Sequence, residues 1–141
     1  MTAMNRPTLS RGLRNCNPGN IRRSKNPYKG EIVPSQDPAF RQFRSLDWGY
    51  RAIFVLLDTY QVRYGLRTIA QMISRWAPPS ENRTDLYIRT VCQRTGIPSD
   101  RPLDTRDRRT MVPLAAAISF VENGVAADMT EVEKGWELFI F

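Results

Sequence analysis

Apolar residues recur with helical spacing through most of the chain after Ser45. Between Ser45 and Gly65 they repeat every four residues and fill a broad face, which predicts a central helix that ends at the glycine. A second apolar stripe runs from Thr68 to Trp76, and we expect Pro78 and the proline after it to end that helix. The repeating positions of the first helix are Trp48, Ala52, Leu56 and Tyr60.

The remaining helices carry recognisable start and stop signals. Segment 82–96 ends at Gly96, and either Asn82 or Thr84 is predicted to cap its start. A longer helix is predicted from the acidic stretch 104–107 to residues 123–124, with Pro113 either kinking it or starting a new one. A capping box, Thr130-x-x-Glu133, predicts a final short turn of helix near the C-terminus.

The N-terminal third has a different pattern. Residues 1–13 are polar and basic without periodicity, so we expect a flexible segment. Asn, Pro and Gly dominate residues 14–30, which is typical of an ordered loop with tight turns. Stretches 30–33 and 39–43 flank a proline-bounded turn and predict a short β-hairpin. The predicted fold is therefore α+β and mainly α-helical, with one domain over residues 14–141.

Charge is distributed unevenly along this chain of 141 residues, whose formal net charge is +7. Residues 1–30 hold seven basic residues and no acidic one. This excess indicates a polyanionic partner, such as nucleic acid, an anionic cell-wall polymer or an acidic protein, or else a solvated basic surface. No helix-turn-helix, zinc or aromatic-platform motif accompanies it, so nucleic acid is the least favoured of these partners.

Composition also narrows the chemistry. The chain has no histidine, and its two cysteines, Cys16 and Cys92, match no metal-binding spacing. We therefore expect no metal site and no cofactor, and carboxylates are the expected acids and bases. Apolar runs are too short to span a membrane, and the first residues lack a signal-peptide core, so we expect synthesis in the cytoplasm.

Glu122 occupies an unusual position at the end of an apolar helical run, because the C-terminal pole of a helix disfavours an anion. The apolar surroundings implied by residues 114–121 disfavour the anion as well, so both effects should raise the pKa of Glu122. A carboxylic acid that stays protonated near neutral pH can protonate a glycosidic oxygen. The alternative is structural, with Glu122 accepting backbone N–H bonds or pairing with an arginine.

The Asn-rich loop suggests a site for neutral hydroxyl and acetamido groups. Asn17 and Asn20 supply amides, and Tyr28, Trp76 and Tyr87 are aromatic residues that can stack on sugar rings. The alternative is that the asparagines serve only the turn in which they lie.

The sequence also resembles a known protein family. The strings RNCNPGNIR and RWAPPSENRT, at residues 14–22 and 75–84, resemble a family of small phage proteins often described as virion or structural proteins. The resemblance covers residues 11–124. It implies a phage origin and virion proteins as partners.

A second resemblance concerns chemistry. The segments NPGNIR and FRQFRS are similar to elements of bacterial cell-wall glucosaminidases with a lysozyme-like fold, in which a helix ending in Glu-Ser-Gly comes first. Here the similar helix end, SFVENG, lies at residues 119–124, after these elements, as in a circular permutation. The resemblance implies that residues 14–141 form one lysozyme-like domain. It assigns Glu122 as the catalytic acid and Asn20 and Ile21 to the loop that lines the cleft.

The resemblance implies a phage-encoded glycosidase or lytic transglycosylase that cleaves the β-1,4 bonds between the amino sugars of peptidoglycan. Glycosidases generally use a second carboxylate, for which Glu81 and Asp37 are candidates, whereas lytic transglycosylases manage with one glutamate. We expect action at the bacterial cell wall or in the virion. The alternative is a virion structural or cell-wall-binding protein that keeps a lysozyme-like fold without catalysis.

Overall fold

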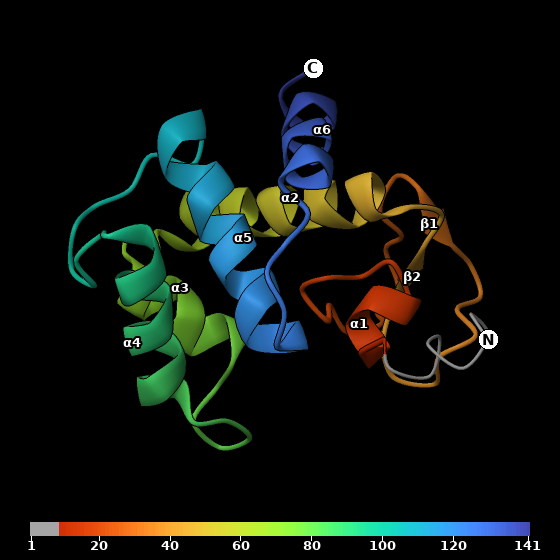
Figure 1. Cartoon of the computed structure of the whole chain (residues 1–141), viewed down its shortest axis with the longest axis horizontal. Coiled ribbons are helices and arrows are strands. Elements are labelled where there is room, and N and C mark those ends of the chain that lie inside the picture. The colour runs from red at the N-terminus through yellow and green to blue at the C-terminus, as the bar shows by residue number, and fades with distance from the viewer. Residues whose placement is uncertain (1–8) are drawn as a thin grey trace.

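The computed structural model describes residues 9–141 and is mainly helical, with one small antiparallel sheet (Figure 1). The predicted α+β class, mainly α, is confirmed. The elements are α1 (Arg11–Arg14), β1 (Glu31–Ile32), β2 (Gln42–Phe43), α2 (Leu46–Tyr64), α3 (Ile69–Trp76), α4 (Thr84–Thr95), α5 (Arg108–Asn123) and α6 (Met129–Ile140).

Helix α2 is the central element, as its broad apolar face predicts. The N-terminal loop, α1 and the sheet lie beside the first turns of α2, and α3 and α4 lie toward its other end (Figure 1). Gly65 ends α2 with φ 66°, a left-handed conformation that glycine adopts without steric penalty. Helices α5 and α6 complete the packing around α2.

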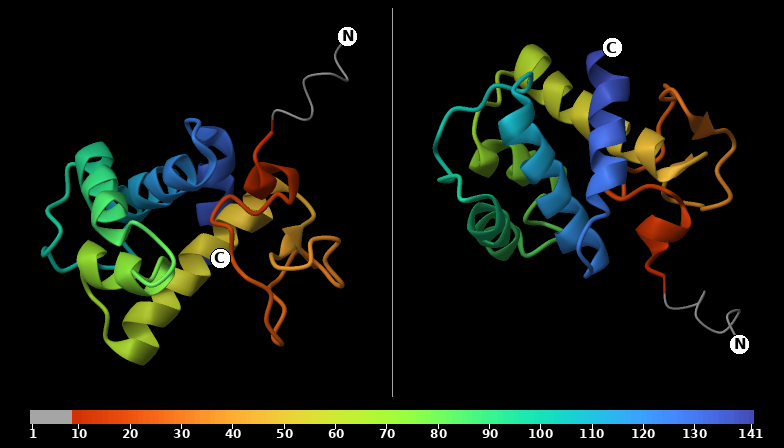
Figure 2. Two further views of the ribbon diagram at one scale, coloured as in Figure 1. Left: turned by 90° about the horizontal axis from the view of Figure 1, so that it is seen from below. Right: turned by 45° about the horizontal axis from the view of Figure 1, so that its top comes forward.

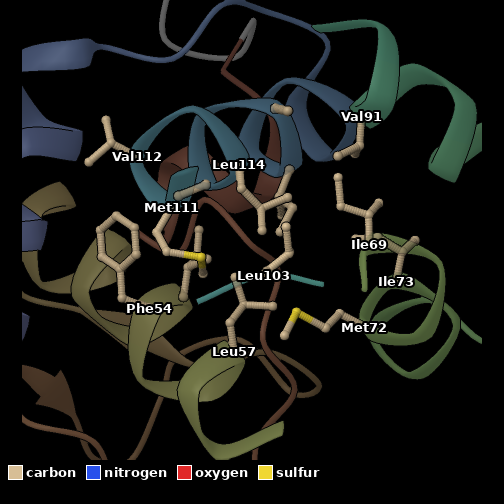
Figure 3. Close-up of a cluster of buried hydrophobic side chains, with 14 of the residues drawn as sticks. Phe54, Leu57, Ile69, Met72, Ile73, Val91, Leu103, Met111, Val112 and Leu114 are labelled. Atoms are coloured by element: carbon tan, nitrogen blue, oxygen red, sulfur yellow. The ribbon is translucent and has the colours of Figure 1, made fainter. Parts of the chain in front are cut away.

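The main core lies between α2, α3, α4, α5 and α6 (Figure 3). Phe54 and Leu57 of α2 point into it from one side, and Met111 and Leu114 of α5 do so from the other. Trp136 of α6 packs edge-on against Phe54, with ring centroids 5.1 Å apart. Helix α6 is therefore a docked element of 12 residues, longer than the short turn that the sequence predicts.

The N-terminal loop packs on the start of α2 through a smaller cluster. Ile21, Phe43 and Ala52 form its buried centre. Glycine is required at position 49, because a Cβ atom there would lie 2.0 Å from the backbone oxygen of Cys16. The predicted hairpin is confirmed over two residues per strand, with Glu31 opposite Phe43.

Two predicted helix starts are wrong, because the residues expected to cap them do not accept from the first backbone N–H groups of the helix. Arg83 precedes the first turn of α4, while Asn82 and Thr84 donate to the carbonyl oxygens of the proline-rich turn before it. Helix α6 starts one residue before Thr130, because the side chain of Asp128 accepts from the first free backbone N–H groups. Asp107 caps α5 as expected, and Pro113 lies within that helix without ending it.

Two further expectations concern the flexible N-terminal segment and the absence of membrane-spanning helices. The predicted flexible segment lies mostly outside the described residues, since only residues from 9 onward are described, and its last part belongs to α1, which Ser10 caps. Between residues 9 and 141, no helix combines the length and the apolar character needed to cross a membrane. The right-hand view of Figure 2 shows the C-terminal end of α5 directed toward α1, and the two helices are in contact.

Candidate functional site

A cleft of about 410 Å³ opens where the N-terminal loop, α2, the end of α3 and the end of α5 meet. Residues between Gly19 and Tyr28 line one side, and residues between Arg75 and Asn82 line another. Glu122 reaches the cleft from the last turn of α5. The structure thus brings together the predicted site residues Asn20, Ile21, Tyr28, Trp76, Glu81 and Glu122.

Glu122 is held by two side chains from distant parts of the sequence. The amide nitrogen of Asn20 donates to its Oε1 at 2.8 Å, and the hydroxyl of Tyr87 donates to its Oε2 at 2.9 Å. Burial raises the pKa of Glu122, and the two hydrogen bonds oppose that rise without cancelling it. The predicted direction of the shift is confirmed. The result is a carboxyl group that holds its proton more strongly than a free glutamate does and faces a cleft.

The loop that carries Asn20 is shaped by its neighbours. Asn20 has φ 48°, a left-handed conformation that asparagine tolerates better than most residues, and its side chain there meets Glu122. Asn17 was expected to contact substrate, but it is fully buried. Its amide group bonds to the backbone N–H and carbonyl of Ile21 and to the carbonyl of Arg41. Asn17 therefore positions the loop instead of facing the cleft.

Asn123 joins the two ends of the site, a role that could not be predicted from its position at a helix end. Its amide nitrogen donates to the carbonyl oxygens of Pro18 and Ser119, each at 2.9 Å. Its oxygen accepts from the hydroxyl of Ser10. One side chain thus fixes the last turn of α5 against both the start of α1 and the loop below the cleft.

The predicted aromatic residues have different positions. Tyr28 and Trp76 line the cleft and are partly exposed, so their rings are accessible to a ligand. Tyr87 is only 6% exposed and uses its hydroxyl to hold Glu122. Burial and the adjacent carboxyl raise the pKa of Tyr87 well above its usual value, so it remains a hydrogen-bond donor. Phe40 and Tyr60 also line the cleft and were not predicted.

Comparison with known proteins finds a phage relative. The chain is 39% identical to Protein P5 of Pseudoalteromonas phage PM2 over 132 residues, which cover 91% of this chain and 81% of the phage protein. The chain belongs to the P5 family. No family model matches it. The expected relationship to a phage protein family is confirmed by this relative.

Of the two predicted second carboxylates of this P5-family chain, one lies in the cleft and the other is structural. Glu81 lines the cleft, is exposed, and lies 3.9 Å from the guanidinium of Arg22. Asp37 accepts hydrogen bonds from Arg11 and Asn15, and the arginine holds the pKa of Asp37 well below its usual range. Asp37 is not among the residues that line the cleft. Glu81 is therefore the better placed of the two predicted second carboxylates.

Glu31 lies in strand β1, and its side chain is buried. Its side chain is 6% exposed and pairs with the equally buried guanidinium of Arg41. Arg41 also donates to the carbonyl of Arg22 and to the hydroxyl of Ser24, and it stacks over the ring of Tyr28. The ion pair therefore ties the hairpin to the loop that forms one side of the cleft. Within residues 9–141, no three potential metal ligands lie close enough together to hold an ion.

Proposed function

We propose that this P5-family protein is a peptidoglycan-degrading enzyme, a glycosidase or lytic transglycosylase that cleaves β-1,4 bonds between amino sugars. Glu122 is its general acid. The observation that carries the proposal is the position of Glu122, a largely buried carboxyl with a raised pKa, in a cleft beside the amide of Asn20 and the rings of Tyr28 and Trp76. Amides and aromatic rings suit the hydroxyl groups and the ring of a sugar, and a carboxyl with a raised pKa suits the protonation of its glycosidic oxygen.

The proposal includes a lysozyme-like fold in permuted order. In the resembling glucosaminidases, the helix with the catalytic glutamate precedes the loop that lines the cleft. Here the matching segments are 102 residues apart and in the opposite order, yet Asn20 donates directly to Glu122. The bond from Asn123 to the carbonyl of Pro18 adds a second contact between the same segments. These two contacts between the segments support the proposed permutation.

A second groove next to the cleft supports a polymeric substrate. This groove is lined by Leu86, Phe120 and Gly124, and it shares Asn82 and Glu122 with the cleft. A glycan chain that occupied both would pass Glu122 with sugars on either side of the bond to be cleaved. The carboxyl proton would go to the leaving oxygen as the bond from that oxygen to the anomeric carbon breaks.

The departure of the leaving group creates positive charge on the sugar, which a nucleophile must quench. In a hydrolytic reaction, Glu81 would take a proton from the attacking water, since it lines the same cleft. In a lytic transglycosylase, a hydroxyl of the sugar itself would attack and return its proton to Glu122, giving an anhydro sugar. The reducing ends of the products distinguish the two routes.

A second function is favoured by one observation. Both oxygens of Glu122 accept hydrogen bonds from the protein, as expected of a carboxyl that serves only to join α5 to the loop. In that case the protein would be a virion component that binds the cell wall through the cleft without cleaving it. Either role places the protein at the bacterial cell wall or in the virion.

The decisive experiment uses the full chain, isolated peptidoglycan and the variant Glu122→Gln. Glutamine preserves the shape of the side chain, and Tyr87 can accept from its amide, so the cleft should remain intact. Glu137→Gln is the matched control, because Glu137 lies exposed on α6. Release of soluble fragments by the wild type and the control, and not by Glu122→Gln, supports the enzyme. Binding without release by all three supports the structural role, and equal release by all three removes Glu122 from the mechanism.

A further inference from the structure

Three arginines line the cleft, and they differ in what they already bind. Arg41 is buried and committed to Glu31, Ser24 and the carbonyl of Arg22. Its guanidinium is therefore occupied by the protein. Arg22 and Arg75 are exposed and remain accessible to a ligand in the cleft.

Arg75 is supported by aromatic rings instead of a counter-ion. Its guanidinium lies 3.9 Å from the ring centroid of Tyr64 and 5.4 Å from that of Tyr60. Within the described part of the chain, no carboxylate lies within 4.0 Å of its nitrogen atoms. Stacking leaves the edge of a guanidinium free, so its N–H groups stay available for an anion.

Arg22 has a similar arrangement on the other side of the cleft. Its guanidinium lies 5.4 Å from the ring centroid of Phe40, and its nearest carboxylate, Glu81, is 3.9 Å away. That separation is too long for a hydrogen bond, so the pair contributes little and an incoming anion can compete with it. Two stacked guanidinium groups thus line a cleft that also contains Glu122, whose pKa is raised by burial.

We propose that Arg22 and Arg75 form a carboxylate-binding subsite, which makes the cleft selective for an amino-sugar polymer with acidic substituents over a neutral one. This inference rests on the proposed function, because it names the substrate class of the same cleft. Arginine suits the task, since its planar fork matches the two oxygens of a carboxylate. In peptidoglycan the carboxylate can come from the stem peptide or, once the peptide is removed, from the lactyl group of the sugar.

The test measures binding in the Glu122→Gln background, so that cleavage does not interfere. The probes are soluble peptidoglycan strands with stem peptides, the same strands after removal of the peptides, and chitohexaose, which has the same β-1,4 linkage without carboxylates. The variants are Arg22→Gln and Arg75→Gln, with Arg101→Gln as a control. Arg101 is exposed and is not among the cleft-lining residues, so its replacement removes the same charge elsewhere.

Each cleft variant should weaken binding of acidic strands by about tenfold, the lower end of the range for hydrogen bonds to charged groups. Binding of chitohexaose should change less than twofold, and Arg101→Gln should behave like its parent. A loss confined to strands with peptides identifies the peptide carboxylate, and a loss retained after their removal identifies the lactyl group. Either result supports the subsite.

Two results would refute the subsite alone, and a third would also refute the proposed function. If the cleft variants bind acidic strands as well as their parent does, or lose no more than Arg101→Gln, the subsite is refuted while the proposed function stands. If the wild type cleaves chitohexaose as readily as peptidoglycan, selectivity for acidic glycans is refuted in the same way. Failure of the wild type to bind any of the three probes would refute both the subsite and the proposed function.

Discussion

Replacing Glu31 with glutamine tests the buried ion pair that supports one side of the cleft. The side chains of Glu31 and Arg41 are 6% and 3% exposed, so the variant leaves a guanidinium in a site from which water is largely excluded. Breaking a buried pair by removing one charge costs about 3–5 kcal/mol. Glutamine can still accept one hydrogen bond, so we expect a loss near the lower end, about 3 kcal/mol.

Urea unfolding followed by circular dichroism measures this loss as a change in the free energy of unfolding. For a chain of this length, about 3 kcal/mol should lower Tm by roughly 10 °C. Because a buried pair is poorly screened, the loss should be similar at low salt and at high salt. Glu137→Gln should unfold like the wild type under all these conditions, because its side chain is exposed.

A double-mutant cycle separates the pair from the general effect of each substitution. Arg41→Met strands the carboxylate of Glu31 and should also be strongly destabilising, whereas the double variant removes both charges and should lose less than the sum of the two. A loss below about 1 kcal/mol in Glu31→Gln would refute the reasoning. Strict additivity in the cycle would also refute it, because it would mean that the two charges do not interact.

Three further predictions concern the acid and the packing of the loop. Because the folded-state pKa of Glu122 is raised, the native state binds more protons than the unfolded state. The free energy of unfolding should therefore fall as pH rises from the usual glutamate pKa through the folded-state value. Urea titrations at several pH values should show this fall in the wild type and not in Glu122→Gln. Tyr87→Phe removes a hydrogen bond that lowers the pKa of Glu122. The alkaline limb of the plot of kcat/KM against pH should therefore move to higher pH. An unchanged limb would argue against Glu122 as the general acid. Gly49→Ala should lower the free energy of unfolding by more than about 3 kcal/mol, because the new Cβ would collide with the backbone of Cys16. At Gly96 a new Cβ meets no atom within 4 Å, so Gly96→Ala should lose only about 1 kcal/mol in the same unfolding assay.

The elements that could be predicted are those with strong local signals. The face of α2 repeats every four residues and ends at Gly65, and α3 has a true capping box with Thr68 at its N-cap. The start of α6 could not be placed from its motif, because Asp128 and Thr130 both lie where a cap is expected and only the backbone geometry chooses between them. Local pattern therefore predicted the elements better than their exact ends.

The site divides along similar lines. Glu122 was identifiable because it places an anion at the C-terminal pole of a helix, where a cation is favoured. Its contact with Asn20 was implied by the resemblance and not by the sequence pattern. The roles of Asn123 and of the Arg41–Glu31 pair depend on partners chosen by tertiary packing, which no spacing in the sequence encodes. Asn17 was assigned to substrate because an amide looks the same in a sequence whether it faces a ligand or a buried carbonyl.

The contacts that Asn123 and Glu122 make with the N-terminal loop also determine when the cleft can form during synthesis on the ribosome. The loop is synthesised early, but Asn20 meets its partner only after 102 more residues have been added. At usual ribosome speeds of about 5–20 residues per second, that interval lasts on the order of 5–20 s. During this interval the loop lacks its contacts with Asn123 and Glu122, so a chain interrupted before α5 forms only one side of the cleft. The cleft is completed only when the last turn of α5 has been made.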